Sequence, residues 1–283
     1  MDDTTNRLGE FLRARRGLVR PEDVGLPDLG RRRVDGLRRE ELALLAGVSV
    51  DYYVRLEQGR DTHPSAQVLE ALARALRLDD DAVAHLHELA APAPRRRRRA
   101  SVERVRPGVL RLLEHWTDTP AFVLGRRMDV LAYNALAGLL HSDFARERNI
   151  VRLVFLDPGA REIYPDHEAV AAETVATLRA AAGADLDDPA LTELVGELSL
   201  KSDLFRRLWA RHDVREKASG TKRFVHPMVG EIVLDYETLR VNDAPEQLVV
   251  GYHAAPGSPS AQALALLATI AAEQDVPAVA TTA

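Results

Sequence analysis

Through about the first 90 residues, apolar side chains recur every three or four positions, which is the spacing of one face of an α-helix. The pattern predicts a helix over 7–16, two short helices within 37–60, a helix capped by Ser65 and a helix that begins near Asp81. Five short helices in so few residues predict one compact all-α domain.

The first of the two short helices has a single apolar stripe, because Leu42, Leu45 and Ala46 lie three and four positions apart. We expect these three side chains to be buried. Gly47 follows directly, and glycine readily adopts the left-handed backbone conformation that ends many helices. The stripe and the glycine together predict a short helix followed by a tight turn.

A second helix follows this turn, with Ser49 as its N-cap and with Tyr53 and Leu56 facing inward. Two short helices joined by a glycine-containing turn form a helix-turn-helix, whose second helix can lie in the major groove of DNA. A purely structural helical hairpin is the alternative, but the turn glycine, the serine cap and the outward basic residues all favour DNA binding. The outer face, which would meet base edges, consists of Val50, Asp51, Tyr52 and Arg55.

Arginines flank this motif. Arg39 begins the first motif helix, where its long side chain can reach a phosphate, and three consecutive arginines precede it at 31–33. A solvated basic loop is the alternative for the segment 31–33. The residues predicted to contact DNA are Arg31, Arg32, Arg33, Arg38, Arg39, Ser49, Val50, Asp51, Tyr52, Arg55 and Arg60.

The segment 37–60 resembles the helix-turn-helix of the XRE family of phage-repressor-like DNA-binding domains. The resemblance implies a lambda-repressor-like fold and sequence-specific binding to double-stranded operator DNA. Two positions depart from the family pattern: Arg39 stands where many members carry glutamine, and Arg38 replaces a capping serine or threonine. Because one recognition helix reads few base pairs, we expect a homodimer that reads two half-sites.

Composition adds limits to this picture. The length of 283 residues favours two domains, and the net charge is −5. Residues 1–100 contain 19 arginines and 17 acidic residues, whereas the remainder contains 19 basic and 26 acidic residues, so only the first part has a positive balance. Cysteine is absent, which excludes disulfides and thiolate sites. With no membrane-length apolar run and no signal-peptide core, we expect a cytoplasmic protein.

A segment rich in proline and arginine, APAPRRRRRA at 91–100, predicts a linker after a first domain at 1–90. An arm that follows DNA phosphates is the alternative role for this segment. A second domain is expected over 101–272, and a flexible tail over 273–283. Strands are predicted at 121–124, 130–133, 221–225, 231–241 and 247–253. With helices before, between and after these strands, the second domain is predicted to be α+β, with helices against an antiparallel sheet.

Five stretches of this second half form a recognisable set: RNIVRLVFLDP at 148–158, FRRLWARHDV at 205–214, HPMVG at 226–230, LDY at 234–236 and PGSPS at 256–260. With these stretches, the second half resembles the MmyB-like ligand-binding domain, a PAS-like sensor attached to XRE-type regulators. The resemblance implies a transcription regulator with a small-molecule pocket, and fatty acids are the ligand class that the family suggests.

A PAS-like sheet commonly leaves a pocket under its covering helices, lined by apolar side chains with a few polar anchors. Arg206, His226 or Asn134 is expected to hold a polar head group, although helix capping is the simpler role for Asn134. For each apolar candidate, ordinary core packing is the alternative. The predicted pocket residues are Phe122, Leu131, Leu153, Phe155, Phe205, Arg206, Trp209, Phe224, His226, Val233 and Tyr236.

Catalysis and metal binding have little support. His212 and Asp213 are adjacent and point in different directions on a helix, so a catalytic pair is not expected. We expect Arg211 and Asp213 to form surface or edge ion pairs that hold the sheet to the helices instead. His85 and His87 are two positions apart on a helix, so they lack metal-ligand spacing. We expect a regulator that is not an enzyme and has no cofactor beyond a fatty-acid-like ligand. A second domain that only dimerises or binds a partner protein is the alternative, and an enzymatic domain is a more remote one.

Overall fold

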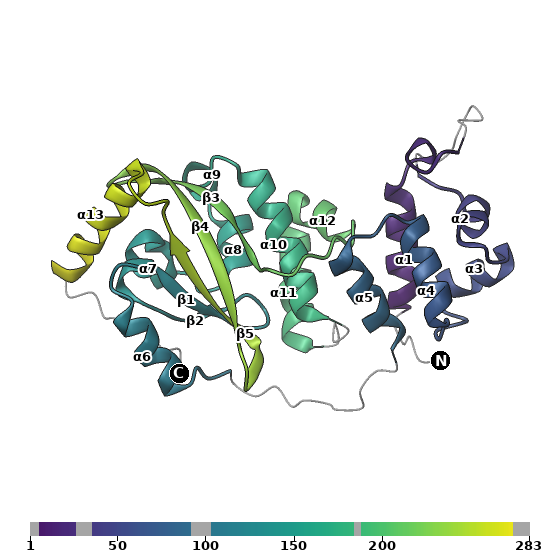
Figure 1. The fold of residues 1–283 in the computed structure, drawn as a ribbon, viewed down its shortest axis with the longest axis horizontal. Helices are drawn as coiled ribbons and strands as arrows, with labels where there is room; N and C mark the ends of the chain where they lie inside the picture. Colours follow the sequence, from purple (N-terminus) through teal and green to yellow (C-terminus); the bar gives the residue numbers. More distant parts are fainter. Residues whose placement is uncertain (1–5, 27–35, 92–102, 184–187, 274–283) are drawn as a thin grey trace. The chain divides into compact units, whose positions relative to one another are not determined.

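The computed structural model describes residues 6–26, 36–91, 103–183 and 188–273 (Figure 1). The chain divides into two compact units. We call the first the helical unit; among the described residues it contains α1 to α5 and the segment Arg206–Arg215. The other described residues form the sheet unit. The predicted DNA contacts Arg31, Arg32 and Arg33, nearly all of the predicted linker and nearly all of the predicted tail lie outside the described residues.

The helical unit follows the predicted order of helices. Its core contains fully buried side chains from several helices, among them Phe11, Leu12, Leu42, Tyr53 and Leu56. A short 3₁₀ helix that the apolar pattern did not predict, η1, follows the first helix. The elements are α1 (Arg7–Leu18), η1 (Pro21–Val24), α2 (Arg39–Ala46), α3 (Val50–Glu57), α4 (Ala66–Ala75) and α5 (Asp80–Ala90).

One expectation for α2 is wrong. Leu45 is 36% exposed, whereas Ala43 is fully buried beside Leu42 and Ala46. Helix α2 packs against both α3 and α4, so its buried face must serve two neighbours. A face that includes adjacent positions 42 and 43 meets both helices, and Leu45 is turned away from them.

The sheet unit begins with a helix and continues through short helices and five strands. Its elements are α6 (Pro107–His115), β1 (Ala121–Leu124), β2 (Val130–Tyr133), α7 (Ala135–Leu140), η2 (Ser142–Ala145), α8 (Ile150–Leu156), α9 (Ala160–Ile163), α10 (His167–Ala182), α11 (Pro189–Lys201), α12 (Asp203–Trp209), β3 (Ser219–His226), β4 (Gly230–Val241), β5 (Ala244–His253) and α13 (Pro259–Glu273). The last residues of α12 belong to the helical unit.

The five strands form one antiparallel sheet in the order β2-β1-β5-β4-β3. The first and last strands are therefore neighbours at the centre, with Phe122 opposite Val250. Tyr236 lies opposite Tyr252 across the next pair. The predicted α+β fold with a PAS-like antiparallel sheet is confirmed.

Alternate residues of the strands serve two different faces of the sheet. Helix α6 covers one face, where Val109 and Leu113 pack with Val123 and Val249. The opposite face presents aromatic rings, and α10 and the segment around His141 lie over it (Figure 1). The cavities described below lie on this second face.

Candidate DNA-binding surface and ligand pocket

The helix-turn-helix has the predicted local geometry. Gly47 ends α2 with φ of 67°, a left-handed conformation that side chains with a Cβ rarely adopt. Ser49 caps α3, and its hydroxyl oxygen accepts a hydrogen bond from the Tyr52 backbone N–H at 3.2 Å. Tyr53 and Leu56 are fully buried. The sequence thus fixes α3 in place by a turn, a cap and two inward anchors.

The outer face of α3 is available to a partner. Val50 is 41% exposed, and Asp51 and Arg55 are also exposed. The Arg55 guanidinium lies 5.7 Å from the centre of the Tyr52 ring, within the range of a cation–π contact. This contact orders an aromatic ring and a cation together at the surface where base edges would be met.

A buried carboxylate joins α1, α2 and α3. Glu57 accepts hydrogen bonds at 2.6 Å from Nε of Arg16 and at 2.6 Å from Nε of Arg39, and at 2.7 Å from the Tyr53 hydroxyl. Burial alone would raise the pKa of Glu57, but the bonds from Arg16, Arg39 and Tyr53 outweigh it and the pKa is lowered. Burial and the neighbouring Glu57 raise the pKa of Tyr53. We call these four residues the Glu57 cluster.

The same cluster positions a predicted phosphate contact. Arg39 is the first residue of α2, and its side chain is 44% exposed while its Nε is held by Glu57. Helix α2 lacks a serine cap; instead the Arg38 backbone N–H donates to the Glu41 carboxylate at 2.7 Å. Arg38 and Arg60 are exposed. The position of Arg38 therefore does not prevent a regular helix start.

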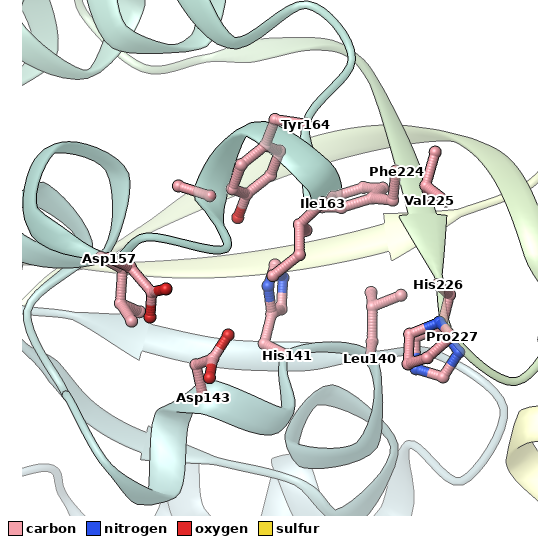
Figure 2. A pocket seen from close by; sticks show the side chains of 12 residues that line it. Leu140, His141, Asp143, Asp157, Ile163, Tyr164, Phe224, Val225, His226 and Pro227 are labelled. Carbon is pink, nitrogen blue, oxygen red and sulfur yellow. The ribbon is translucent and has the colours of Figure 1, made fainter.

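A first cavity opens beside α7 and the end of β3 (Figure 2). Figure 2 shows His141, Ile163 and Tyr164 converging on it, with Asp143 on one side and His226 on the other. It contains about 490 Å³ of empty space including the part open to solvent, of which the centres of water molecules can occupy about 30 Å³. The full lining is Leu140, His141, Asp143, Leu153, Asp157, Ala160, Ile163, Tyr164, Phe224, Val225, His226 and Pro227.

A second cavity shares two of these residues, His141 and Tyr164, as part of its wall. It contains about 420 Å³ of empty space, again including the part open to solvent, and the centres of water molecules can occupy about 20 Å³ of it. Most of its lining is apolar or aromatic, but three charged side chains also reach it. The full lining is Phe122, Leu124, Met128, His141, Ile150, Val154, Tyr164, Val170, Glu173, Thr174, Thr177, Lys217, Lys222 and Tyr252.

These charged residues form a second buried cluster. The Lys217 ammonium lies 3.5 Å from the Glu173 carboxylate and 3.9 Å from the centre of the Tyr236 ring. The Tyr236 hydroxyl donates to the same carboxylate at 2.5 Å, and the Lys222 ammonium lies 5.5 Å from the Tyr236 ring centre. We call Glu173, Lys217, Lys222 and Tyr236 the lysine cluster.

The electrostatics of the lysine cluster reflect an excess of positive charge. Burial and the neighbouring Lys222 lower the pKa of Lys217 to about 7, despite the opposing attraction of Glu173. Burial also lowers the pKa of Lys222. Burial opposes ionisation of Glu173, but Lys222 and Lys217 lower the pKa of this carboxyl overall. The single carboxylate is therefore ionised while the ammonium groups are hard to keep charged.

His141 stands between the two cavities. Burial, together with Lys222, His226 and Lys217, lowers the pKa of His141 to about 3, so the ring is neutral near pH 7. Its Nε2 atom is buried and has no hydrogen-bond partner within the described residues. An unsatisfied buried nitrogen costs free energy, and such atoms in native proteins call for an explanation.

Comparison with protein families addresses these two sites separately. A helix-turn-helix domain family matches residues 7–86. The MmyB-like transcription regulator ligand binding domain family matches residues 105–267, which is more than half of the chain. The chain belongs to the MmyB-like family. No curated protein matches it. The MmyB-like chain is thus a DNA-binding transcription regulator with a ligand-binding domain, as the two family resemblances implied.

The MmyB-like ligand-binding domain brings only part of the predicted pocket together. Leu153, Phe224 and His226 line the first cavity, and Phe122 lines the second. The other predicted residues line neither of these two cavities: Leu131, Phe155, Phe205, Arg206, Trp209, Val233 and Tyr236.

The structure gives several of these residues other positions. Leu131 packs under α6 on the opposite face of the sheet, and Val233 is 43% exposed because it alternates with the inward Ile232 and Leu234. Phe205 is fully buried against the Phe155 ring. Tyr236 touches the second cavity indirectly, through Glu173 and Lys217.

The predicted head-group candidates are already engaged. The Asn134 Oδ1 accepts from the Ala121 and Ala137 backbone N–H groups, at 3.1 and 2.9 Å, so Asn134 is the helix cap of α7. The His226 Nε2 lies 3.0 Å from the Leu139 carbonyl oxygen. Arg206 belongs to the helical unit and lines neither of the two cavities.

Sequence reasoning missed His141, Lys217 and Lys222. One signal was present for Lys222: it lies two residues before Phe224 and four before His226 on a strand, so all three share a face. A lysine in phase with buried residues is unusual and indicates a functional position.

The remaining chemistry is limited. Asp213 forms ion pairs with Arg211 at 2.8 Å and with Arg15 at 2.5 Å. Both pairs lie inside the helical unit, so they do not hold the sheet to the helices as expected. Across the described residues, no three histidine, aspartate or glutamate side chains gather as a metal site. None of the described helices is long and apolar enough to cross a membrane.

Proposed function

We propose that this regulator acts in the cytoplasm as a homodimer that senses a fatty-acid-like ligand, without enzymatic activity. The observation that carries the ligand proposal is the pair of cavities that share His141 and Tyr164 under one face of the sheet. Apolar and aromatic side chains make up most of their lining, which suits a hydrocarbon chain.

The proposed ligand must enlarge these cavities when it binds. The space open to water centres in the first cavity, about 30 Å³, accommodates about two water molecules. A hydrocarbon chain therefore has to move the side chains that now separate the two cavities. Because any such change alters packing in the sheet unit, ligand binding and conformation are coupled here.

The proposed dimer follows from the size of the recognition element. Helix α3 has eight residues, and only its exposed first turns can reach base edges. A symmetric pair of such helices reads two half-sites. Switching then requires the ligand to bind the DNA-competent and DNA-incompetent arrangements with different affinities.

The test is to compare the native and denatured masses of freshly purified protein and to identify any molecule extracted by organic solvent. We expect a bound amphiphile of a few hundred daltons on each protomer of a dimeric species. If the protein is free of ligand, its thermal stability is measured with added fatty acids, because a ligand that binds only the folded state raises the midpoint. Absence of both a bound molecule and a thermal shift would leave a domain that only dimerises.

A further inference from the structure

The lysine cluster has more positive than negative groups. The chain contains only three lysines, Lys201, Lys217 and Lys222, and two of them line the second cavity. The Lys217 side chain is only 5% exposed. Glu173 is the one carboxylate that lines this cavity. Two ammonium groups that face one carboxylate in a cavity leave a second anion to be supplied.

Other polar groups at this cavity cannot supply that anion. Burial raises the pKa of Tyr252 well above its usual range, and the neighbouring Tyr164 and Glu173 raise it further, so the phenol stays neutral. The ring of His141 is neutral as well, and its Nε2 lacks a partner among the described residues. The cavity therefore offers two lysine side chains, an unsatisfied imidazole nitrogen and walls that are mostly apolar or aromatic.

We propose that Lys217 and Lys222 bind the carboxylate of an anionic amphiphile in the second cavity, and that its hydrocarbon chain runs past His141 and Tyr164 into the first. This assignment rests on the proposed sensing of a fatty-acid-like ligand and names the groups that select it. The head group lies beside the two lysines in the second cavity, and the hydrocarbon chain extends along the apolar lining.

Several features favour a carboxylate over a larger anion. The second cavity as a whole offers only about 20 Å³ to water centres, so a small head group needs less rearrangement of its lining than a larger anion does. Lysine provides a compact point charge whose protonation can change on burial, whereas arginine is the usual residue for bidentate phosphate recognition. The amphiphile's charge also offsets the repulsion between the two ammonium groups, which an uncharged alcohol of the same length cannot do.

Calorimetric titration of the full-length protein tests this assignment with two probes, decanoate and 1-decanol. The variants are Lys217→Met and Lys222→Met, and Lys201→Met is the matched control because Lys201 is an exposed lysine on α11. We expect each cluster variant to weaken decanoate binding about ten- to a hundredfold, the usual effect of losing a charged hydrogen bond. Binding of 1-decanol should change less than about threefold in every variant, because uncharged contacts are retained.

A second measurement needs no variant. At pH 8 the wild-type protein should take up protons when decanoate binds, because an added carboxylate raises the pKa of Lys217. The titratable groups near Lys217 are Lys222, Glu173, Tyr236 and His141, and 1-decanol brings no charge to any of them. Proton uptake is measured by titration in buffers of different ionisation enthalpy, and 1-decanol should give none.

The outcomes separate the two proposals. Equal binding of both probes, unaffected by either cluster variant and without proton uptake, would overturn the lysine assignment and keep an apolar ligand site. Failure of both probes to bind would overturn the fatty-acid-like ligand as well as the assignment. Selective loss of decanoate binding with proton uptake in the wild type supports both.

Discussion

The Glu57 cluster and the lysine cluster contain the same number of charged groups, but they differ in how far water reaches the extra positive charge. Each places two cations and a tyrosine around one carboxylate, which is buried in Glu57 and 23% exposed in Glu173. In the Glu57 cluster, both carboxylate oxygens accept bonds at 2.6–2.7 Å, and Arg39 is 44% exposed, so water solvates the extra charge. In the lysine cluster the extra cation is enclosed, and the pKa of Lys217 falls to about 7.

This difference distinguishes a structural cluster from a binding site. Arginine cannot be deprotonated in proteins and offers several fixed donors, so it suits a permanent junction between helices. Lysine shifts its pKa readily when buried. A buried charge that is left uncompensated is costly to the folded protein, and a ligand of opposite charge recovers that free energy.

The largest expected effect comes from breaking the structural cluster. Glu57→Gln should lower the free energy of unfolding of the helical unit by about 3–5 kcal/mol, because Arg16 and Arg39 then lose a buried counter-charge. Urea denaturation followed by circular dichroism measures this loss. Glu40→Gln, at an exposed position of α2, should shift stability by less than about 0.5 kcal/mol. Equal losses of unfolding free energy in the two variants would contradict the proposed structural role of Glu57.

The lysine cluster should respond to pH instead. The pKa of Lys217 is about 7 in the folded protein and near 10.5 in the unfolded chain. Between these values the unfolded chain binds a proton that the folded protein lacks, so the free energy of unfolding rises with pH through this window. We expect the rise from Lys217 to be about 2–4 kcal/mol between pH 7 and pH 10.

Lys217→Met isolates this contribution, because Lys222, Glu173 and Tyr236, the groups that face Lys217, all remain in place. The variant should be at least as stable as the wild type at pH 7 and should lack the additional rise toward pH 10. Denaturation curves at three pH values provide the comparison. Identical pH profiles for the two proteins would show that Lys217 is not held in a charge-disfavouring site.

On DNA, Arg55→Ala should cost about 1–3 kcal/mol of operator binding and relax discrimination at particular base pairs, because Arg55 and Tyr52 form the exposed face of α3. Fluorescence anisotropy with operator and scrambled duplexes measures both quantities. Arg74→Ala, an exposed arginine on α4, is the control. Equal loss on both duplexes would argue against base reading by Arg55.

The smallest expected effect concerns Arg39, which belongs to both the Glu57 cluster and the predicted DNA surface. Arg39→Ala should weaken binding to every duplex and reduce the magnitude of the salt slope, d log K/d log[salt], by about 1, since a phosphate contact carries no base information. Binding constants at four salt concentrations give the slope. A slope equal to that of the wild type would assign Arg39 to the Glu57 cluster alone.

Local features of the fold were predictable from the chain because they depend on near neighbours. The glycine that ends α2, the serine that caps α3 and Asn134 at the start of α7 each act within a few residues. The period-two strands of the sheet also followed from their own sequence. A short apolar stripe was less informative, as Leu45 shows: its exposure depends on which helices α2 packs against.

The candidate pocket was harder to predict because its chemistry is assembled from distant positions. Glu173 on α10 meets Lys217, which precedes β3, and Tyr236 on β4. The spacing of apolar residues within one helix or strand cannot predict contacts between residues so far apart in the sequence. The predicted pocket residues include Phe122 and Phe224, which line the cavities, and Leu131, which does not. A strand with buried residues on both faces does not indicate which face adjoins a cavity.

The strand order has a consequence for how the protein is made. Residues 121–124 of β1 pair with residues 248–251 of β5, so the centre of the sheet cannot form until nearly the whole chain has left the ribosome. The helical unit relies largely on contacts among its first 90 residues, which are synthesised early. Each new molecule therefore acquires its recognition helix well before its sensor, and a chain truncated ahead of β5 would be a DNA-binding protein without regulation.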